Sequence, residues 1–111
     1  MTELGKSIED GVAVLSCPGR LNMSAAPRFK QLVDDVVGEG ASRVVVDLSE
    51  TTFVDSSGLG AMVGGLKTAR QAGGDLRIAG AGEQVRTVLS LTNLDRILKA
   101  YPTVEDARHG W

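Results

Sequence analysis

Hydrophobic positions along this chain follow two spacings, one typical of strands and one typical of helices. Apolar residues alternate weakly over 4–8 and form a better strand over 12–15. Glu9-Asp10-Gly11 between them predicts a hairpin, because Asp-Gly is favoured where the backbone needs a positive φ. Pro18-Gly19 ends the second strand. Residues 44–48 form a continuous, mostly β-branched run, which predicts a strand that is central or covered on both faces.

Three segments carry the apolar spacing of amphipathic helices. Ser24 is predicted to cap the first of them, with Pro27 tolerated in its first turn. Glycines at 38, 40, 73 and 74 are predicted to end the first two helices. The apolar faces are Phe29, Leu32, Val33, Val36 and Val37; then Leu59, Met62, Val63, Leu66 and Ala69; then Val85, Val88 and Leu89.

Two further strands complete the pattern, one around Leu76 and Ile78 and an edge strand over 97–101, and residues 103–108 are predicted to form one helical turn. Strands joined through helices lie parallel with right-handed crossovers, whereas the opening hairpin is antiparallel. The sequence therefore predicts a small α/β domain with a mixed four- to five-stranded sheet and helices mainly on one face. A chain of 111 residues fits a single domain over residues 1–111.

Composition and charge exclude several classes of protein. Apolar residues make up 42% of the chain but aromatic residues only 4%, so the core must be aliphatic. A net charge of −2 argues against nucleic-acid binding. The sequence has no run of 18 apolar residues, so we expect no membrane insertion. Cys17 is the only cysteine, and Met1–Gly5 lacks the basic and apolar stretches of a leader. We therefore expect a cytoplasmic location.

The charged side chains Lys67, Arg70 and Arg77 are interpreted as exposed.

Candidate chemistry for an enzyme is weak. His109 is the only histidine and lies two residues from the last residue, so no serine has an evident base. The glycine-rich stretches 58–63 and 80–85 lack the third glycine of a dinucleotide fingerprint and the Lys of a Walker loop. Cysteine, histidine and carboxylates show no metal-ligand spacing. We expect no catalytic residue, metal or cofactor, and only weak nucleotide binding stays open.

The junction Asp55-Ser56-Ser57 stands between an apolar run and the second helix. Asp and Ser are preferred N-caps, so one of these residues has a purely structural interpretation. Three capping residues exceed what one helix needs. A hydroxyl at a helix N-terminus lies where backbone N–H groups and the helix dipole favour a negative charge. The junction is therefore also a candidate for a serine that accepts phosphate or is recognised by a partner.

The hexapeptide Asp-Ser-Ser-Gly-Leu-Gly at 55–60, following the strand at 44–48, resembles the STAS-domain family. More narrowly, it resembles the bacterial anti-sigma-factor antagonists. The resemblance covers nearly the whole chain. Asn22 stands where the family commonly has Asp. Three further motifs match the family: Gly19-Arg20-Leu21, Gln71-Ala72-Gly73-Gly74 and Leu91-Thr92-Asn93-Leu94.

The resemblance implies a partner-switching role rather than an enzyme activity. The unphosphorylated antagonist binds an anti-sigma factor that is also a serine kinase, and so frees a sigma factor. The kinase then phosphorylates the serine after the Asp, which is Ser56 here, with Ser57 as a secondary candidate. A PP2C-like phosphatase restores the antagonist, and we expect the free protein to be a monomer. The partner surface would comprise Arg20, Asn22, Met23, Ser24, Asp55, Ser56, Ser57, Gly58, Leu59 and Gly60.

An alternative from a different class stays open. The chain would then be a stand-alone STAS scaffold, a subunit of a transporter or of another regulatory assembly, without phosphorylation at Ser56.

Overall fold

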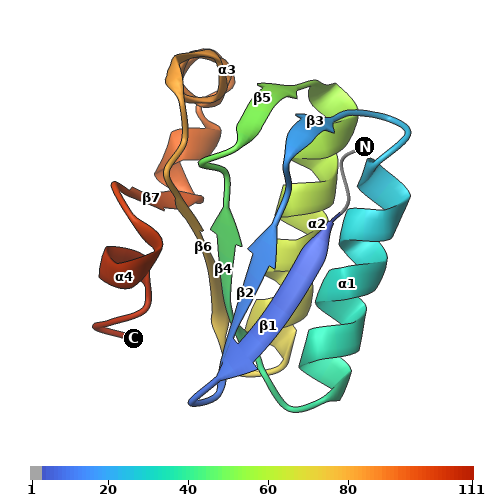
Figure 1. Ribbon diagram of the computed structural model, residues 1–111, viewed down its shortest axis with the longest axis vertical. Helices are drawn as coiled ribbons and strands as arrows, with labels where there is room; N and C mark the ends of the chain where they lie inside the picture. Colours follow the sequence, from blue (N-terminus) through green and yellow to red (C-terminus); the bar gives the residue numbers. More distant parts are fainter. Residues whose placement is uncertain (1–3) are drawn as a thin grey trace.

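A five-stranded mixed sheet forms the centre of this computed structural model, which describes residues 4–111 (Figure 1). Met1–Gly5 was expected not to be a leader, and residues 1–3 of that segment lie outside the described range. The strand order is β1-β2-β4-β6-β7, with β1 antiparallel to β2 and the other neighbours parallel. The strands are β1 Gly5–Glu9, β2 Val12–Ser16, β4 Arg43–Asp47, β6 Asp75–Ala79 and β7 Lys99–Tyr101.

Three of the predicted features of this sheet are confirmed. Asp10 and Gly11 have φ of 54° and 76° and close the hairpin between β1 and β2. The β-branched run at 44–46 lies in the central strand β4, buried on both faces. The final strand β7 is an edge strand, although it begins only at Lys99.

Helices α1 Ala26–Gly38 and α2 Ser56–Gln71 pack side by side against one face of the sheet (Figure 1). Helix α3 Glu83–Leu91 contributes Val85 and Leu89 to the same core, and the short 3₁₀ helix η1 Leu94–Arg96 follows it. The one-turn helix α4 Val104–Ala107 covers the opposite face, where Ala107 packs with Val12, Val45 and Ala79. The prediction of helices mainly on one face is confirmed.

A second sheet of two parallel strands, β3 Gly19–Leu21 and β5 Thr51–Val54, was not predicted. Pro18-Gly19 does end β2, but the chain resumes an extended course directly after it. Gly19 adopts a φ of 82°, which redirects the chain between the two strands. Strand β3 leads into the loop before α1, and β5 leads directly into α2, so this small sheet places the starts of both helices near each other (Figure 1).

The predicted Ser24 cap is wrong. Helix α1 begins at Ala26, and its N-cap Ala25 makes no side-chain capping bond. The side-chain oxygen of Asn22 instead accepts hydrogen bonds from the backbone N–H groups of Ser24 and Ala25, at 3.1 and 3.2 Å. Asn side chains commonly bond to the backbone two residues ahead, and this turn precedes the helix.

The interpretation of Arg77 as an exposed charge is also wrong, whereas Lys67 and Arg70 are exposed. Strand alternation points Leu76 and Ile78 toward the core under α1 and α2 and points Arg77 to the other face, where it is 5% exposed. The end of the chain covers it there. The Arg77 guanidinium donates to the carbonyls of Ala107, His109 and Gly110, and lies 3.9 Å from the ring centroid of Trp111 and 5.0 Å from that of Tyr101.

Within residues 4–111, no helix is both long enough and apolar enough to cross a membrane.

Candidate functional site

The Asp55 side chain organises the start of helix α2. Asp55 is the N-cap, with extended backbone, and its Oδ1 accepts the N–H of Gly58 at 2.9 Å. Its Oδ2 accepts the N–H of Met23, at 3.2 Å, from the loop between β3 and α1. The capping interpretation of Asp55 is therefore confirmed, and the same carboxylate also ties two distant parts of the chain together.

Ser56 is the first residue of α2, and its side chain is exposed. Ser57, one residue further into the helix, is half-buried. A group added to Ser56 would project into solvent beside the positive end of the helix dipole. Of the two hydroxyls, that of Ser56 is therefore the more accessible to another protein.

Gly58 allows the β3 strand to lie against the first turn of α2. A Cβ at this position would lie 2.1 Å from the carbonyl oxygen of Leu21, which is closer than atoms can approach. The N–H of Asp55 donates to that same carbonyl at 3.4 Å. Leu59 is only 5% exposed and packs in the core. Gly58 and Leu59 were expected in the partner surface, but both residues are buried.

The remaining expected surface residues come from two segments, residues 20–24 and the start of α2. Arg20, Met23, Ser24 and Gly60 are exposed, and Asn22 is half-buried because its amide bonds the loop. Met23 is 73% exposed. An exposed methionine is unusual, and its flexible, polarisable side chain adapts well to a partner.

Phe53 lies beside Arg20, one of the expected surface residues, and was not predicted from the sequence to take part. It is 37% exposed and is the third residue of β5, two residues before Asp55, and the Arg20 guanidinium lies 5.5 Å from its ring centroid. In a chain with 4% aromatic residues, an aromatic two residues before the serine motif was a signal that the sequence offered. Exposed aromatic and arginine side chains are the types most enriched at protein interfaces.

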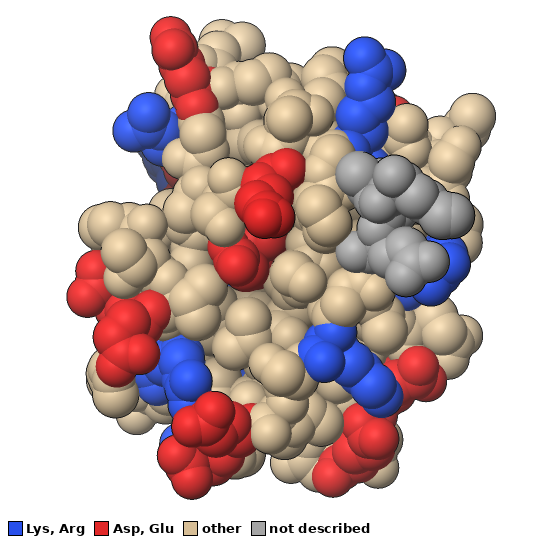
Figure 2. Space-filling model, in the orientation of Figure 1, with Lys and Arg blue, Asp and Glu red and all other residues tan. Residues whose placement is uncertain are grey.

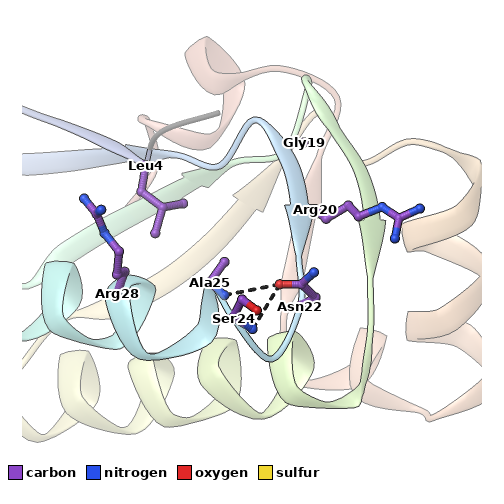
Figure 3. A pocket seen from close by; sticks show the side chains of 7 residues that line it. All are labelled: Leu4, Gly19, Arg20, Asn22, Ser24, Ala25 and Arg28. Atoms are coloured by element: carbon purple, nitrogen blue, oxygen red, sulfur yellow. Dashed lines mark hydrogen bonds between the residues drawn. The ribbon is translucent and has the colours of Figure 1, made fainter. Parts of the chain in front are cut away.

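A pocket of about 480 Å³ lies beside this surface, on the loop side (Figure 3). In the close-up, the Asn22 side chain points back to the loop, Leu4 and Arg28 lie together, and the Arg20 side chain extends away from them. Arg28 was not among the expected residues. The Arg20 guanidinium lies by the Phe53 ring and is turned away from the pocket, so Arg28 is the basic side chain that lies beside Leu4 in its lining. Its lining is Leu4, Gly19, Arg20, Asn22, Ser24, Ala25 and Arg28.

The charged side chains form no large patch of one sign on the face seen in Figure 2, where basic and acidic groups are interspersed. In the part of the chain that the structure describes, no group of three or more His, Cys, Asp or Glu side chains could hold a metal ion. Burial, together with the nearby Asp47 carboxylate, raises the pKa of the Cys17 thiol to about 12. Cys17 is therefore not a reactive thiolate at neutral pH.

Comparison with known proteins gives a family match over almost the whole chain. The model of the STAS domain matches residues 5–107. A Thermotoga maritima protein provisionally named an anti-sigma factor antagonist is 39% identical over 101 residues, which are 90% of this chain and 89% of that protein. The anti-sigma-F factor antagonist RsfB of Mycobacterium tuberculosis H37Rv is 28% identical over 103 residues, or 91% of this chain and 82% of RsfB.

Comparison with solved structures finds the same family. A crystal structure of a Thermotoga maritima protein, also provisionally named an anti-sigma factor antagonist, superposes with a TM-score of 0.87 at 37% sequence identity. The superposition covers 95% of this chain and 91% of that structure.

Proposed function

Because this chain belongs to the STAS-domain family of anti-sigma-factor antagonists, we propose that it binds an anti-sigma factor with serine kinase activity and that phosphorylation of Ser56 separates the two proteins. The observation that carries the proposal is the exposure of Ser56 at the start of α2, beside an Asp55 carboxylate whose two oxygens are both fixed by backbone N–H groups. The partner surface would include Arg20, Met23 and Phe53 around this serine.

The chemical step is a phosphoryl transfer. The Ser56 oxygen attacks the γ-phosphorus of ATP bound to the partner, a new O–P bond forms, and the bond between the γ-phosphorus and the bridging oxygen breaks. ADP leaves, and the hydroxyl proton passes to a base of the kinase. A PP2C-like phosphatase would later hydrolyse the phosphoserine and return the antagonist to its binding state.

The added charge acts differently in the free protein and in the complex. Phosphorylation adds about −1.5 to −2 charges. The N-terminus of α2 offsets about 0.3–1 kcal/mol of the cost. Repulsion from Asp55, taken at about 5 Å and an effective dielectric of about 20, is roughly 3 kcal/mol for each unit charge. Asp55 cannot turn away without losing its bonds to Met23 and Gly58.

Water screens most of this repulsion in the free protein. Under a partner's surface the screening is lost, and desolvation of the phosphate adds a further cost. A loss of only about 3 kcal/mol weakens binding by more than 100-fold. The free domain should therefore tolerate the phosphate, whereas the complex should not.

Co-purification from the native host tests the proposal. Ser56→Ala should retain the partner, because alanine adds no charge and little bulk, and mass spectrometry should identify an ATP-binding serine kinase. With that kinase, ATP and Mg²⁺, wild type should be phosphorylated on Ser56, and Ser56→Ala should lose nearly all labelling. Ser57→Ala is the matched control.

Labelling that survives in Ser56→Ala and disappears in Ser57→Ala would contradict the choice of serine. Recovery of a transporter subunit in place of a kinase would instead support the scaffold role.

A further inference from the structure

A side chain of helix α3 closes the outer edge of strand β5. The N–H of Val54 donates to Oε1 of Gln84 at 3.1 Å, and Nε2 of Gln84 donates to the carbonyl of Val54 at 3.3 Å. One carboxamide thus bonds both backbone groups of one residue. A neighbouring strand would bond Val54 in the same way.

This contact lies on the side of β5 away from its strand partner. Strand β5 pairs with β3, and the N–H of Asp55 donates to Leu21 of that strand. Because the backbone groups of successive strand residues point to opposite edges, those of Val54 face α3. Gln84 is the second residue of α3 and is half-buried.

The contact is also close to the acceptor serine in the chain. Val54 is the last residue of β5, Asp55 caps α2, and Ser56 begins it. The main chain that carries Ser56 is therefore held on one edge by Leu21 and on the other by Gln84.

We propose that Gln84 is a positioning residue for the phosphorylation of Ser56. Its carboxamide fixes the main chain of Val54, and this fixes the direction in which Asp55 and Ser56 leave the strand. Helix α3 and the acceptor serine consequently move as one unit. This inference rests on the function proposed above, because it concerns the rate at which a kinase can use Ser56.

Two substitutions separate the roles of the carboxamide. Gln84→Glu keeps an acceptor for the N–H of Val54, but at neutral pH its carboxylate has no donor for the Val54 carbonyl. Gln84→Met keeps the length and the helix propensity and loses both bonds. Gln71→Met is the matched control, because it makes the same change at an exposed position at the end of α2.

The first measurement uses the protein alone. Amide hydrogen exchange, followed residue by residue by NMR, reports local opening. We expect the Val54 amide to exchange at least tenfold faster in Gln84→Met than in wild type, with Gln84→Glu between them and Gln71→Met unchanged. An unchanged Val54 amide in Gln84→Met would overturn the inference.

The second measurement uses the kinase recovered with the Ser56→Ala bait, with ATP and Mg²⁺. A misplaced acceptor should lower kcat at least fivefold in Gln84→Met and leave KM within twofold, because the docking surface is intact. If Gln84→Met is too unstable to compare, Gln84→Glu decides, with a smaller fall in kcat expected.

The two proposals fail in different ways. Wild-type kinetics in the Gln84 variants would overturn the positioning role alone. A wild-type protein that accepts no phosphate on Ser56 would overturn the proposed function.

Discussion

The carboxylate of Asp55 accepts a hydrogen bond from the backbone N–H of Met23 at 3.2 Å, although 32 positions separate the two residues. The same carboxylate caps α2 through Gly58. The loop before α1, which carries the exposed Met23 side chain, is therefore fixed directly to the turn that carries Ser56. A change in the charge or position of this turn therefore acts on the loop directly through the Asp55 carboxylate.

Ser56→Asp should weaken partner binding and leave the fold intact. An acidic residue is tolerated at a helix N-terminus, but beside Asp55 and under a partner it meets repulsion and a desolvation cost. Aspartate carries less charge than phosphate, so we expect a partial loss of affinity, on the order of tenfold. Calorimetric titration and thermal melting of the same variant measure the two effects.

Gln71→Glu is the control for Ser56→Asp, because it adds one negative charge about 22 Å away, at the other end of the same helix. This control should bind normally. A Ser56→Asp protein that melts far below wild type would show that damaged structure, and not charge, causes the loss of binding.

Gly58→Ala should destabilise the protein by about 2–4 kcal/mol, because the new methyl group would overlap the Leu21 carbonyl and force β3 away from α2. Gly60→Ala, in the same helix turn, should instead stabilise it by about 0.5–1 kcal/mol, because a Cβ there meets nothing within 4 Å and alanine is the better helix former. Urea denaturation of both variants tests the pair. Equal effects would contradict the close approach of β3.

Alkaline pH should reveal the buried thiol of Cys17. Its pKa is raised from 9.0 to about 12 in the folded protein, so between these values the unfolded chain loses a proton that the folded chain keeps. Stability should therefore fall as pH rises through this window, by up to about 1.4 kcal/mol per pH unit from this group.

The Cys17→Ala variant isolates that contribution, because every other titrating group is shared with wild type. The stability difference between the two proteins, measured by denaturation from pH 8 to pH 11, should change in favour of the variant. Parallel curves would show that the thiol titrates normally in the folded state.

Arg77→Met should shift the fluorescence of Trp111, the only tryptophan of the chain, toward that of an exposed indole. The substitution removes the guanidinium stacked on the ring and leaves three carbonyls without their donor. We expect a loss of about 1–3 kcal/mol of stability. Arg77→Lys should fail to restore either signal, because an ammonium group lacks the planar fork that bonds several carbonyls at once. Unchanged emission in Arg77→Met would contradict the stacking.

The parts of the fold that depend on repeated spacing were predictable from the sequence. The helical faces built on Phe29 and Met62 are buried as predicted, and the Val44–Val46 run is the central strand. In these segments several residues carry the same signal. The exposure of Ser56 was also predictable, because the N-cap chemistry of Asp55 places it at a helix start.

The missed features each depend on contacts between distant residues. Strands β3 and β5 have three and four residues, which is too few for an alternation of apolar and polar side chains to be recognised in the sequence. The contact of Gln84 with Val54 spans 30 positions, and Arg77 is buried only because residues 107–111 return across the sheet. Ser24 is a preferred capping residue, but the backbone N–H groups before α1 bond to the Asn22 side chain, and Ser24 does not cap the helix.

The separate sheet of β3 and β5 has a consequence for the divergence of duplicated genes. The exposed side chains Arg20 and Phe53 extend from this small sheet, and Met23 from the loop that follows it, whereas Leu21 and Val54 of the same two strands are buried in the core. Under the proposed function, substitution at these three positions would change what a partner contacts and would replace no buried side chain. If that function holds, duplicated copies of such a gene would be able to acquire different partners by a few substitutions, without passing through an unfolded ancestor.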